Sequence, residues 1–586
     1  MTDNTRGCAG KKRKLPNSES ASESNGTMGQ TIQIGDTAEN GSNNDNAINA
    51  ISYVEFYSGV GGWTMALEEA LHKLGPLLSS IQTKKSIGTT NLNHEPKDNN
   101  TNKDSSTSSD PSPEKKHMRH YELKRLAALD HSDLCVKVFS YNFVRAKTTP
   151  ETAVKPSDST KSDKTKRKRR PKDSNRQKSY SIERIPLRQL EEWSADVWAM
   201  SPPCQPHTRQ HNDKNHRDQE HKKDLDDPRS KSFLKICEWL EGTSTGGSSC
   251  SNEKTKNIRL SDESLPSLIF LENVVGFESS NSFRKWRSAL SSRGYRVGHF
   301  HLTPTQVKIP NDRPRYYSIA FRGTGSGINN LIHDLSSLPP RTVNPSLPPV
   351  SSLLSYLNRE TKENDTPPKI YKAIPELHVT PENSMNEDED EDGNKKISTI
   401  SSFLDRNNAN ANTTEAATAT LRVPEKVLQN QSAWCFDIVT PSDRRSSCFT
   451  HSYGRFIRGT GSILYNDEEN QHKGSDAASD DAIGNFKKKN CVIQLFPPDQ
   501  REFQVDWMNQ LDPGKLRYFS GNELARLFGF SESFSFPSDT SLKQQWKLMG
   551  NSLNVRVASK LVELGFLLRY YYCLDEFKTA TTTAEA

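Results

Sequence analysis

The chain has 586 residues, of which only 32% are hydrophobic and 26% are charged. That hydrophobic share is well below the usual value for globular proteins, so a sizeable part of the chain is expected to be disordered. Its 79 basic and 73 acidic residues leave a net charge of only +6. Any nucleic-acid partner would therefore have to be recognised by local clusters of charge rather than by the total.

Cysteine spacing and hydropathy exclude several classes of protein. The nine cysteines form no Cys-x-x-Cys pair and no His/Cys ligand spacing, which argues against a zinc site and against a secreted disulfide framework. No apolar run approaches the roughly 20 residues that a membrane span needs. We expect a soluble intracellular protein, a monomer without metal or membrane partners. Basic clusters at 11–14 and 164–170 are nuclear import signals, phosphate-contacting arms or simply solvated runs, so cytoplasm and nucleus are the expected locations.

Polar stretches divide the chain. Residues 1–49 are rich in Ser, Asn, Thr and Gly without apolar periodicity, which predicts a disordered tail. Similar stretches at 76–116, 151–179, 243–258, 360–420 and 466–488 are interpreted as surface insertions in one fold. Between them, β-prone and helical segments alternate. This alternation indicates an α/β fold, doubly wound around a parallel sheet.

The predicted strands cover 51–57, the apolar stretch before Asp130, 196–200 and 268–271. The last of these is a short continuous apolar run, typical of a parallel strand that is covered on both faces. Helical spacing of apolar residues follows three of the strands: Leu67, Leu71 and Leu74; Leu134, Val138 and Tyr141; Phe283, Trp286 and Leu290.

Two features at the ends of the first two strands suggest a ligand. The glycine-rich turn 56–62 joins a strand to a helix, where backbone N–H groups can approach a bound molecule, although such turns often serve only tight packing. Asp130 ends the second strand, where open α/β sheets commonly place a carboxylate that binds ribose hydroxyls. A helix N-cap is the alternative role for Asp130.

The most specific segment is Pro202-Pro203-Cys204-Gln205-Pro206, directly after the third strand. A free cysteine is more often a buried hydrophobe than a nucleophile, but core cysteines rarely lie in so rigid a loop. Glu272 and Asn273 leave the fourth strand towards the same edge of the sheet. Arg313 and Arg315, at i and i+2, precede a strand at 316–322; such residues on an edge strand usually aid solubility, but both can point into one carbonyl-bearing site.

In this order, the segments resemble the motifs of the cytosine-5 methyltransferase family. The resemblance implies a Rossmann-like S-adenosylmethionine methyltransferase domain with a smaller target-recognition domain. It implies catalytic roles for Cys204, Glu272, Arg313 and Arg315. It also implies cofactor binding by Phe56, Gly59, Gly61, Gly62, Asp130, Asn551 and Val555. The family generally has Phe after the motif's last proline, where this chain has His207, and that exchange could alter closure of the loop.

The segment Cys448-Phe449-Thr450-His451-Ser452-Tyr453-Gly454 is similar to the target-recognition segment of the tRNA(Asp) methyltransferase branch, which resembles DNA methyltransferases. From this we expect tRNA as the substrate, with substrate contacts from Pro203, Gln205, Asn273, Cys448, Phe449, Thr450 and Tyr453. The resemblance divides the chain into a catalytic domain at 50–342, a target-recognition region at 343–510, a segment at 511–575 that completes the catalytic domain, and a tail at 576–586.

The chemistry that follows from these residues is covalent catalysis. Cytosine C5 is a poor nucleophile until a thiolate adds at C6, and Cys204 is the candidate for that addition. Glu272, if protonated in a dry cleft, could donate a proton or hydrogen bond at N3. DNA methylation at the same atom is the second hypothesis, and a catalytically idle scaffold that binds nucleic acid is the third.

Overall fold

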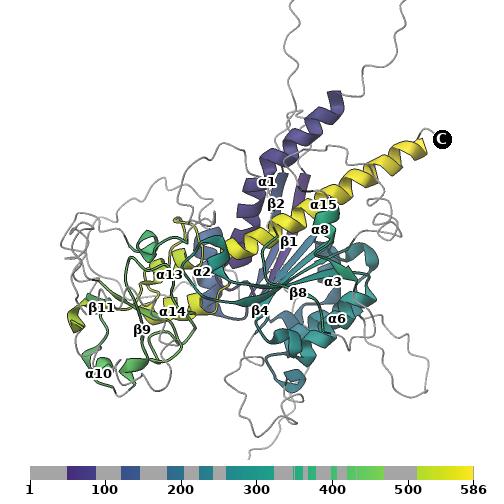
Figure 1. Ribbon diagram of the computed structural model, residues 1–586. Helices are drawn as coiled ribbons and strands as arrows, with labels where there is room; N and C mark the ends of the chain where they lie inside the picture. Colours follow the sequence, from purple (N-terminus) through teal and green to yellow (C-terminus); the bar gives the residue numbers. More distant parts are fainter. Residues whose placement is uncertain are drawn as a thin grey trace, which may run out of the picture. The chain divides into compact units, whose positions relative to one another are not determined.

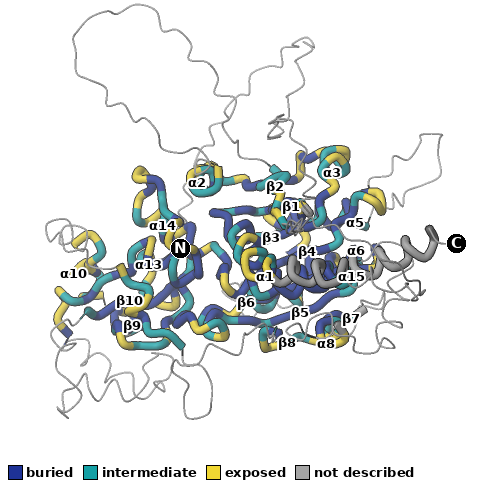
Figure 2. The backbone as a smooth tube through the Cα atoms, turned by 90° about the horizontal axis from the view of Figure 1, so that it is seen from above, coloured by how far each residue is buried: buried dark blue, intermediate teal, exposed yellow. Residues whose placement is uncertain are grey.

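Alternating side chains in the central strands explain why one sheet carries helices on both faces. In the computed structural model, Tyr53 of β1 (Asn49–Phe56) and Phe270 of β4 (Leu268–Val274) belong to one buried cluster, whereas Val54 and Leu271 belong to another. Because successive residues of a strand point to opposite faces, such an apolar run needs cover on both sides. These strands lie at the centre of the fold and are mostly dark blue in Figure 2 (Figures 1 and 2).

The structure describes residues 49–87, 121–144, 181–203, 224–241, 259–322, 348, 350–359, 367–375, 377, 397–405, 419–430, 432–466 and 511–584. Cys204, Gln205 and His207 lie outside these ranges. So do both basic clusters, the predicted N-terminal tail up to residue 48, and most of the predicted insertions.

The large sheet has eight strands, with the order β2-β1-β3-β4-β6-β5-β7 and with β8 paired to β5. β2 (Tyr121–Leu129), β1, β3 (Val197–Met200) and β4 run parallel. The chain winds from β1 to β2 on one side and then to β3 on the other. Ligands of open α/β sheets bind beyond the carboxyl ends of strands at such a reversal. This confirms the predicted doubly wound architecture.

β6 differs from the predicted parallel sheet. β6 (Arg315–Phe321) runs antiparallel to β4 and to β5 (Arg296–Leu302), and it is an interior strand rather than an edge strand. Between β5 and β6 there is only a 3-10 turn, Pro304–Val307, and parallel neighbours would need a longer crossover. The reversed direction brings Arg315, at the start of β6, to the edge where the parallel strands end.

Helices cover both faces of this sheet (Figure 1). α1 (Gly62–Ile87), α2 (Asp133–Phe143) and α15 (Val555–Ala584) contribute to the cluster that contains Tyr53, and α1 packs against α15. α3 (Leu187–Trp193), α5 (Lys231–Glu241) and α6 (Asn281–Ser292) contribute to the cluster that contains Val54. The C-terminal helix therefore completes the layer over a sheet built mainly from the first half of the chain.

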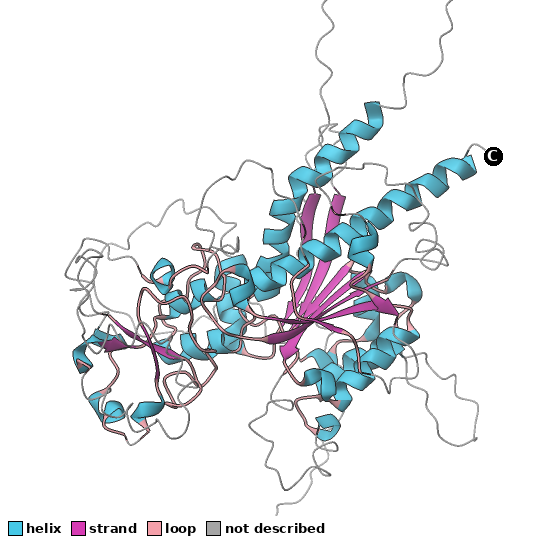
Figure 3. Ribbon diagram, viewed as in Figure 1, coloured by secondary structure: helices cyan, strands magenta, loops and turns pink. Residues whose placement is uncertain are grey.

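Strand pairing crosses two of the predicted domain bounds. A second sheet has the order β11-β10-β9 and consists of β9 (Asp437–Val439), β10 (Ser462–Tyr465) and β11 (Leu516–Arg517) (Figure 3). β11 lies in the segment predicted to complete the catalytic domain, yet it pairs with β10. Conversely, β7 (Asn358–Arg359) and β8 (Ile370–Tyr371) fall in the predicted recognition region but pair with β5. The remaining helices are α8 (Val350–Leu354), α10 (Glu425–Leu428), α13 (Gly521–Leu527) and α14 (Leu542–Gly550).

Two local predictions need correction. α1 continues through Pro76 to Ile87, past the point where an insertion was predicted to begin. α2 buries Val136, Val138 and Phe139, whereas Tyr141, predicted on its apolar stripe, is 39% exposed.

Within the described ranges, no helix is long and apolar enough to cross a bilayer, and no group of three or more His, Cys, Asp or Glu side chains could hold a metal ion.

Candidate active site

The ends of four strands bring the predicted site residues to one edge of the sheet. The glycine turn follows β1, Asp130 follows β2, and Ser201 to Pro203 follow β3. Glu272 and Asn273 are among the last residues of β4 rather than beyond its end. The final residue of β4, Val274, pairs with Arg315 at the start of β6. Parallel strands and one reversed strand thus converge on the same edge.

Glu272 and Arg315 form a partly shielded ion pair, with 3.5 Å between Glu272 Oε1 and Arg315 Nε. Glu272 is only 7% exposed. Burial raises the pKa of Glu272 above its usual range, although Arg315, Arg313 and a hydrogen bond from Ser201 oppose that shift. Burial prevails because removing a carboxylate from water is more costly than these partners repay. The Glu272 carboxyl group therefore holds a proton more readily than it would in water.

The segment before Cys204 is anchored on both sides. Trp63 Nε1 donates to Ser201 Oγ at 3.0 Å, and Asn273 Nδ2 donates to the Pro202 carbonyl at 3.4 Å. Since Ser201 also bonds Glu272, the loop that leads to Cys204 begins next to the Glu272 carboxyl group. Cys204 itself and Gln205 lie beyond the described part of this loop.

Arg313 was predicted to be catalytic, but its guanidinium group is bound to backbone carbonyls. Its guanidinium donates to the carbonyls of Phe449 (2.6 Å), Gly550 (3.0 Å) and Ser552 (2.8 Å). It also lies over the ring of Phe528, 4.8 Å from the centroid, and the residue is 3% exposed. With both terminal nitrogens bound to backbone, Arg313 ties the segment after Cys448 to the turn before α15. It is a positioning residue, whereas Arg315 is the arginine that contacts Glu272.

Cys448 lies between the two arginines, and its Sγ is 3.4 Å from Arg313 Nη1 and 3.9 Å from Arg315 Nη2. Burial alone would raise the pKa of this thiol. The two guanidinium groups outweigh burial, so that the pKa of Cys448 is below its ordinary value. The predicted substrate segment therefore contacts the Glu272–Arg315 pair through Cys448, whose Sγ lies next to Arg315.

The glycine turn and Asp130 also meet. Asp130 Oδ2 accepts from Gly59 N–H at 2.9 Å, and Oδ1 accepts from Ser132 N–H at 2.8 Å. Ser132, not Asp130, is the N-cap of α2, so the N-cap alternative for Asp130 is wrong. Gly61 has φ of +93°, and an added Cβ would lie 2.2 Å from the Phe143 ring. Glycine is therefore required there by both backbone conformation and packing.

Comparison with known families identifies the family of the chain. The family model described as C-5 cytosine-specific DNA methylase matches residues 157–564. The chain belongs to this methylase family. The tRNA (cytosine(38)-C(5))-methyltransferase of Mus musculus is 31% identical over 394 residues, which cover 66% of this chain and 80% of that protein. The DNA (cytosine-5)-methyltransferase of Dictyostelium discoideum is 30% identical over 389 residues, with coverage of 66% and 80%.

The human tRNA (cytosine(38)-C(5))-methyltransferase is 29% identical over 398 residues, covering 66% of this methylase and 85% of the human protein. Among solved structures, Schizosaccharomyces pombe Dnmt2 methyltransferase aligns over 88% of this chain and 98% of its own, with 21% identity and a TM-score of 0.44.

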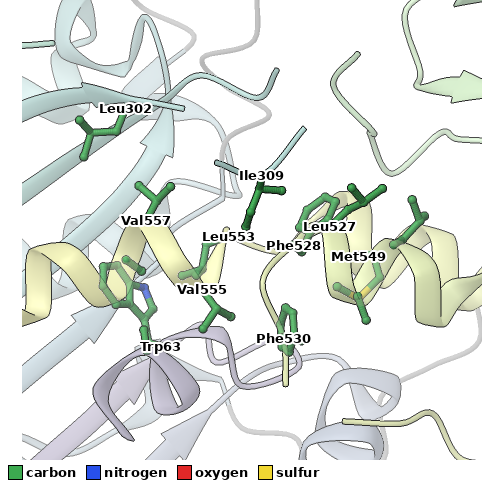
Figure 4. Close-up of a cluster of buried hydrophobic side chains, with 14 of the residues drawn as sticks. Trp63, Leu302, Ile309, Leu527, Phe528, Phe530, Met549, Leu553, Val555 and Val557 are labelled. Atoms are coloured by element: carbon green, nitrogen blue, oxygen red, sulfur yellow. The ribbon is translucent and has the colours of Figure 1, made fainter. Parts of the chain in front are cut away.

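The residues of the methylase fit its methyl donor, S-adenosylmethionine. Each Asp130 oxygen accepts one backbone N–H, and a carboxylate oxygen can accept a second hydrogen bond, as a ribose hydroxyl requires. Phe56 and Val555 are fully buried, and their side chains belong to the two hydrophobic clusters of the core. Leu553 belongs to the buried cluster drawn in Figure 4. It packs against Gly62, where an added Cβ would be 2.9 Å from the Leu553 Cγ. Asn551 is the exposed C-cap of α14.

Two predicted substrate contacts are instead part of the core. Phe449 is 0% exposed and Tyr453 is 4% exposed, and their rings meet edge to face. The Tyr453 hydroxyl donates to the Ser462 carbonyl at 2.6 Å and accepts from Phe519 N–H. Their side chains shape the recognition segment and are closed to a substrate. Thr450 is only partly buried and remains a candidate contact.

Sequence reasoning missed Glu55, a residue of β1 that is 1% exposed and bonds the first turn of α1. Glu55 accepts from Trp63 N–H at 3.2 Å and from the Thr64 hydroxyl at 2.6 Å. Burial raises its pKa to about 7, against the hydrogen bonds and Arg125. The available signal was the single charged residue of the strand, between Val54 and Phe56.

Proposed function

We propose that this methylase transfers the methyl group of S-adenosylmethionine to C5 of a cytosine in tRNA, in the anticodon loop of tRNA-Asp. The observation that carries the chemistry is the buried Glu272 carboxyl group, paired with Arg315 beside the loop that leads to Cys204. The choice of tRNA is supported by the mouse and human relatives named as tRNA (cytosine(38)-C(5))-methyltransferases. It is also supported by the likeness of the segment 448–454 to the tRNA branch.

In this proposal the Cys204 thiolate adds to C6 of the cytosine, and the C5–C6 electron pair moves towards C5 and N3. Glu272 protonates N3 or donates a hydrogen bond to it, for which its raised pKa is suited. Arg315 lies next to that carboxyl group and grips the cytosine carbonyl oxygen. Splitting one difficult step into two easier ones is the gain from the covalent bond.

The cofactor supplies a methyl group bound to a positively charged sulfur. Once C6 carries the thiolate, C5 is electron-rich enough to take that methyl group. A base, for which water suffices, then removes the C5 proton. The electron pair left at C5 re-forms the C5–C6 double bond, the C6–S bond breaks, and Cys204 leaves as a thiolate while Glu272 regains its proton from N3.

DNA is the second candidate substrate, and it has specific support in the relative named DNA (cytosine-5)-methyltransferase. The target base must leave its stack before a thiolate can reach C6. That extrusion costs a few kcal/mol and is cheaper in an unpaired loop than in a duplex. This energy difference favours the anticodon loop as the substrate.

The deciding experiment is methyl transfer from labelled S-adenosylmethionine by the purified full-length protein. The substrates are total tRNA, a tRNA-Asp transcript and duplex DNA of matching sequence, and Cys204→Ala is the control. We expect label in total tRNA and in the tRNA-Asp transcript but not in duplex DNA, with bisulfite sequencing identifying one cytosine of the anticodon loop. Label in duplex DNA but not in tRNA would establish the second candidate, and no label in any substrate would indicate an idle scaffold.

The covalent step has its own test. A transcript with 5-fluorocytosine at the target position has no C5 proton to lose, so the adduct with Cys204 cannot resolve. We expect a protein–RNA band on a denaturing gel for the wild-type protein and none for Cys204→Ala. A transcript that is methylated normally but never trapped would exclude the proposed adduct.

A further inference from the structure

A loop in the recognition segment displays an aromatic ring to solvent. Phe456 is 56% exposed, more than the other exposed large hydrophobic residues of the described ranges, which reach 37–39%. It lies in residues 451–459, between Thr450 and Thr460. The loop continues directly from Cys448, which contacts both active-site arginines.

The loop holds this ring outward through its own bonds. Thr450 N–H donates to the Thr460 carbonyl at 2.9 Å and closes the base of the loop. The Thr460 hydroxyl donates to the Phe456 carbonyl at 2.7 Å. Gly454 lies against Trp546, where an added Cβ would be 2.3 Å from the indole. The exposure of Phe456 is therefore a property of a braced turn and not of a loose end.

Two arginines, Arg455 and Arg458, lie in the same loop as the Phe456 ring. Arg455 lies over one face of Phe456, with its guanidinium carbon 5.1 Å from the ring centroid. Arg458 is exposed in the same turn. Neither arginine forms an ion pair with a carboxylate in the part of the chain that the structure describes. One face of the ring is thus covered by a cation, while 56% of the residue is open to solvent.

We propose that Phe456 stacks on an unpaired base of the RNA that flanks the target cytosine, while Arg455 and Arg458 contact neighbouring phosphates. This inference rests on the proposed function. Single-stranded RNA is recognised by aromatic side chains and arginines that stack on splayed bases. Phe456 is eight positions after Cys448 in the sequence. The Cα atoms of the two residues therefore lie at most about 28 Å apart, within reach of nucleotides that flank the target.

The chemistry of the loop favours a nucleobase over a protein partner. A stable protein interface buries about 800 Å² on each side around an apolar centre. A single ring flanked by two arginines supplies far less apolar surface than that, but it supplies both parts that a nucleotide needs, a stacking face and phosphate donors.

The test compares Phe456→Ala, Phe456→Leu and Phe456→Tyr in steady-state methylation of the tRNA-Asp transcript. Loss of one stacked base lowers affinity by about 5- to 30-fold for a partly exposed ring. We expect Phe456→Ala and Phe456→Leu to raise KM by that factor with kcat unchanged, because stacking is equally strong before and during the reaction. Phe456→Tyr keeps the ring and should stay within about twofold of wild type. Tyr141→Ala, another exposed aromatic, is the matched control and should change neither constant.

The arginines give a second readout. Arg455→Gln and Arg458→Gln should each reduce the slope of log affinity against log salt by about 0.7, as expected for one lost phosphate contact on a single strand. Unchanged KM in Phe456→Ala, or an equal loss in Phe456→Tyr, would overturn the inference while wild-type activity on tRNA upholds the proposed function. A wild-type protein that methylates duplex DNA but no RNA would overturn both.

Discussion

Arg313 and Arg315 are two residues apart, yet substitution by lysine should lower stability at Arg313 and turnover at Arg315. Arg313→Lys keeps a positive charge but replaces a planar fork of donors by a single ammonium group. The native fork reaches three carbonyl oxygens on two separate segments, those of Phe449, Gly550 and Ser552. One ammonium group cannot reach all three from the same backbone position.

The magnitude follows from these contacts. A hydrogen bond from a charged donor contributes about 1.5–3 kcal/mol, and a buried carbonyl left without a donor loses a similar amount. If lysine keeps one of the three bonds, the free energy of unfolding should fall by about 3 kcal/mol for Arg313→Lys and by about 4 kcal/mol or more for Arg313→Ala. The lost contact with the Phe528 ring adds to this, by about 1 kcal/mol.

Arg315→Lys is the matched control, because that side chain is only partly buried and its ion pair with Glu272 spans 3.5 Å. It should change stability by less than about 1 kcal/mol while it lowers turnover. Urea unfolding and methyl transfer measured on both variants distinguish the two roles. The reasoning is refuted if Arg313→Lys unfolds at the wild-type urea midpoint but loses turnover, since Arg313 would then act on the substrate.

Three further substitutions test the site. Glu272→Gln should lower kcat by about 10²- to 10⁴-fold with little change in KM, because the amide cannot pass a proton to N3; wild-type turnover should fall as pH rises through the raised pKa of Glu272. The pKa of Glu55 rises from 4.5 to about 7 on folding, so wild-type stability should fall by about 3 kcal/mol as pH rises across that window; Glu55→Gln should flatten urea midpoints measured against pH. Gly61→Ala should destabilise by about 2–4 kcal/mol through its clash with Phe143.

Each of these has a contrary outcome. An unchanged kcat in Glu272→Gln would remove this carboxyl group from proton transfer. Glu55→Gln should differ from wild type more in slope than in level, so an identical pH dependence would mean that Glu55 is not the group that titrates. For Gly61→Ala the control is Gly59→Ala, where φ is +52° and the nearest atom is 4.0 Å away. Equal losses at the two glycines would leave only the backbone strain, about 1–2 kcal/mol, and no clash.

The spacing of apolar and turn residues along the chain was enough to predict the alternating strands and helices, the doubly wound sheet and the site at the ends of its strands. Such features depend on local chemistry, because a buried parallel strand needs a continuous apolar run and a strand-to-helix turn needs glycine. The pairing of distant segments was decided only in three dimensions. The antiparallel course of β6, the docking of the recognition segment on Gly550 and the use of Arg313 as a brace all depend on contacts between segments that are not neighbours in the sequence. Two arginines that look equivalent in sequence thus differ because only one of them is enclosed by backbone carbonyls.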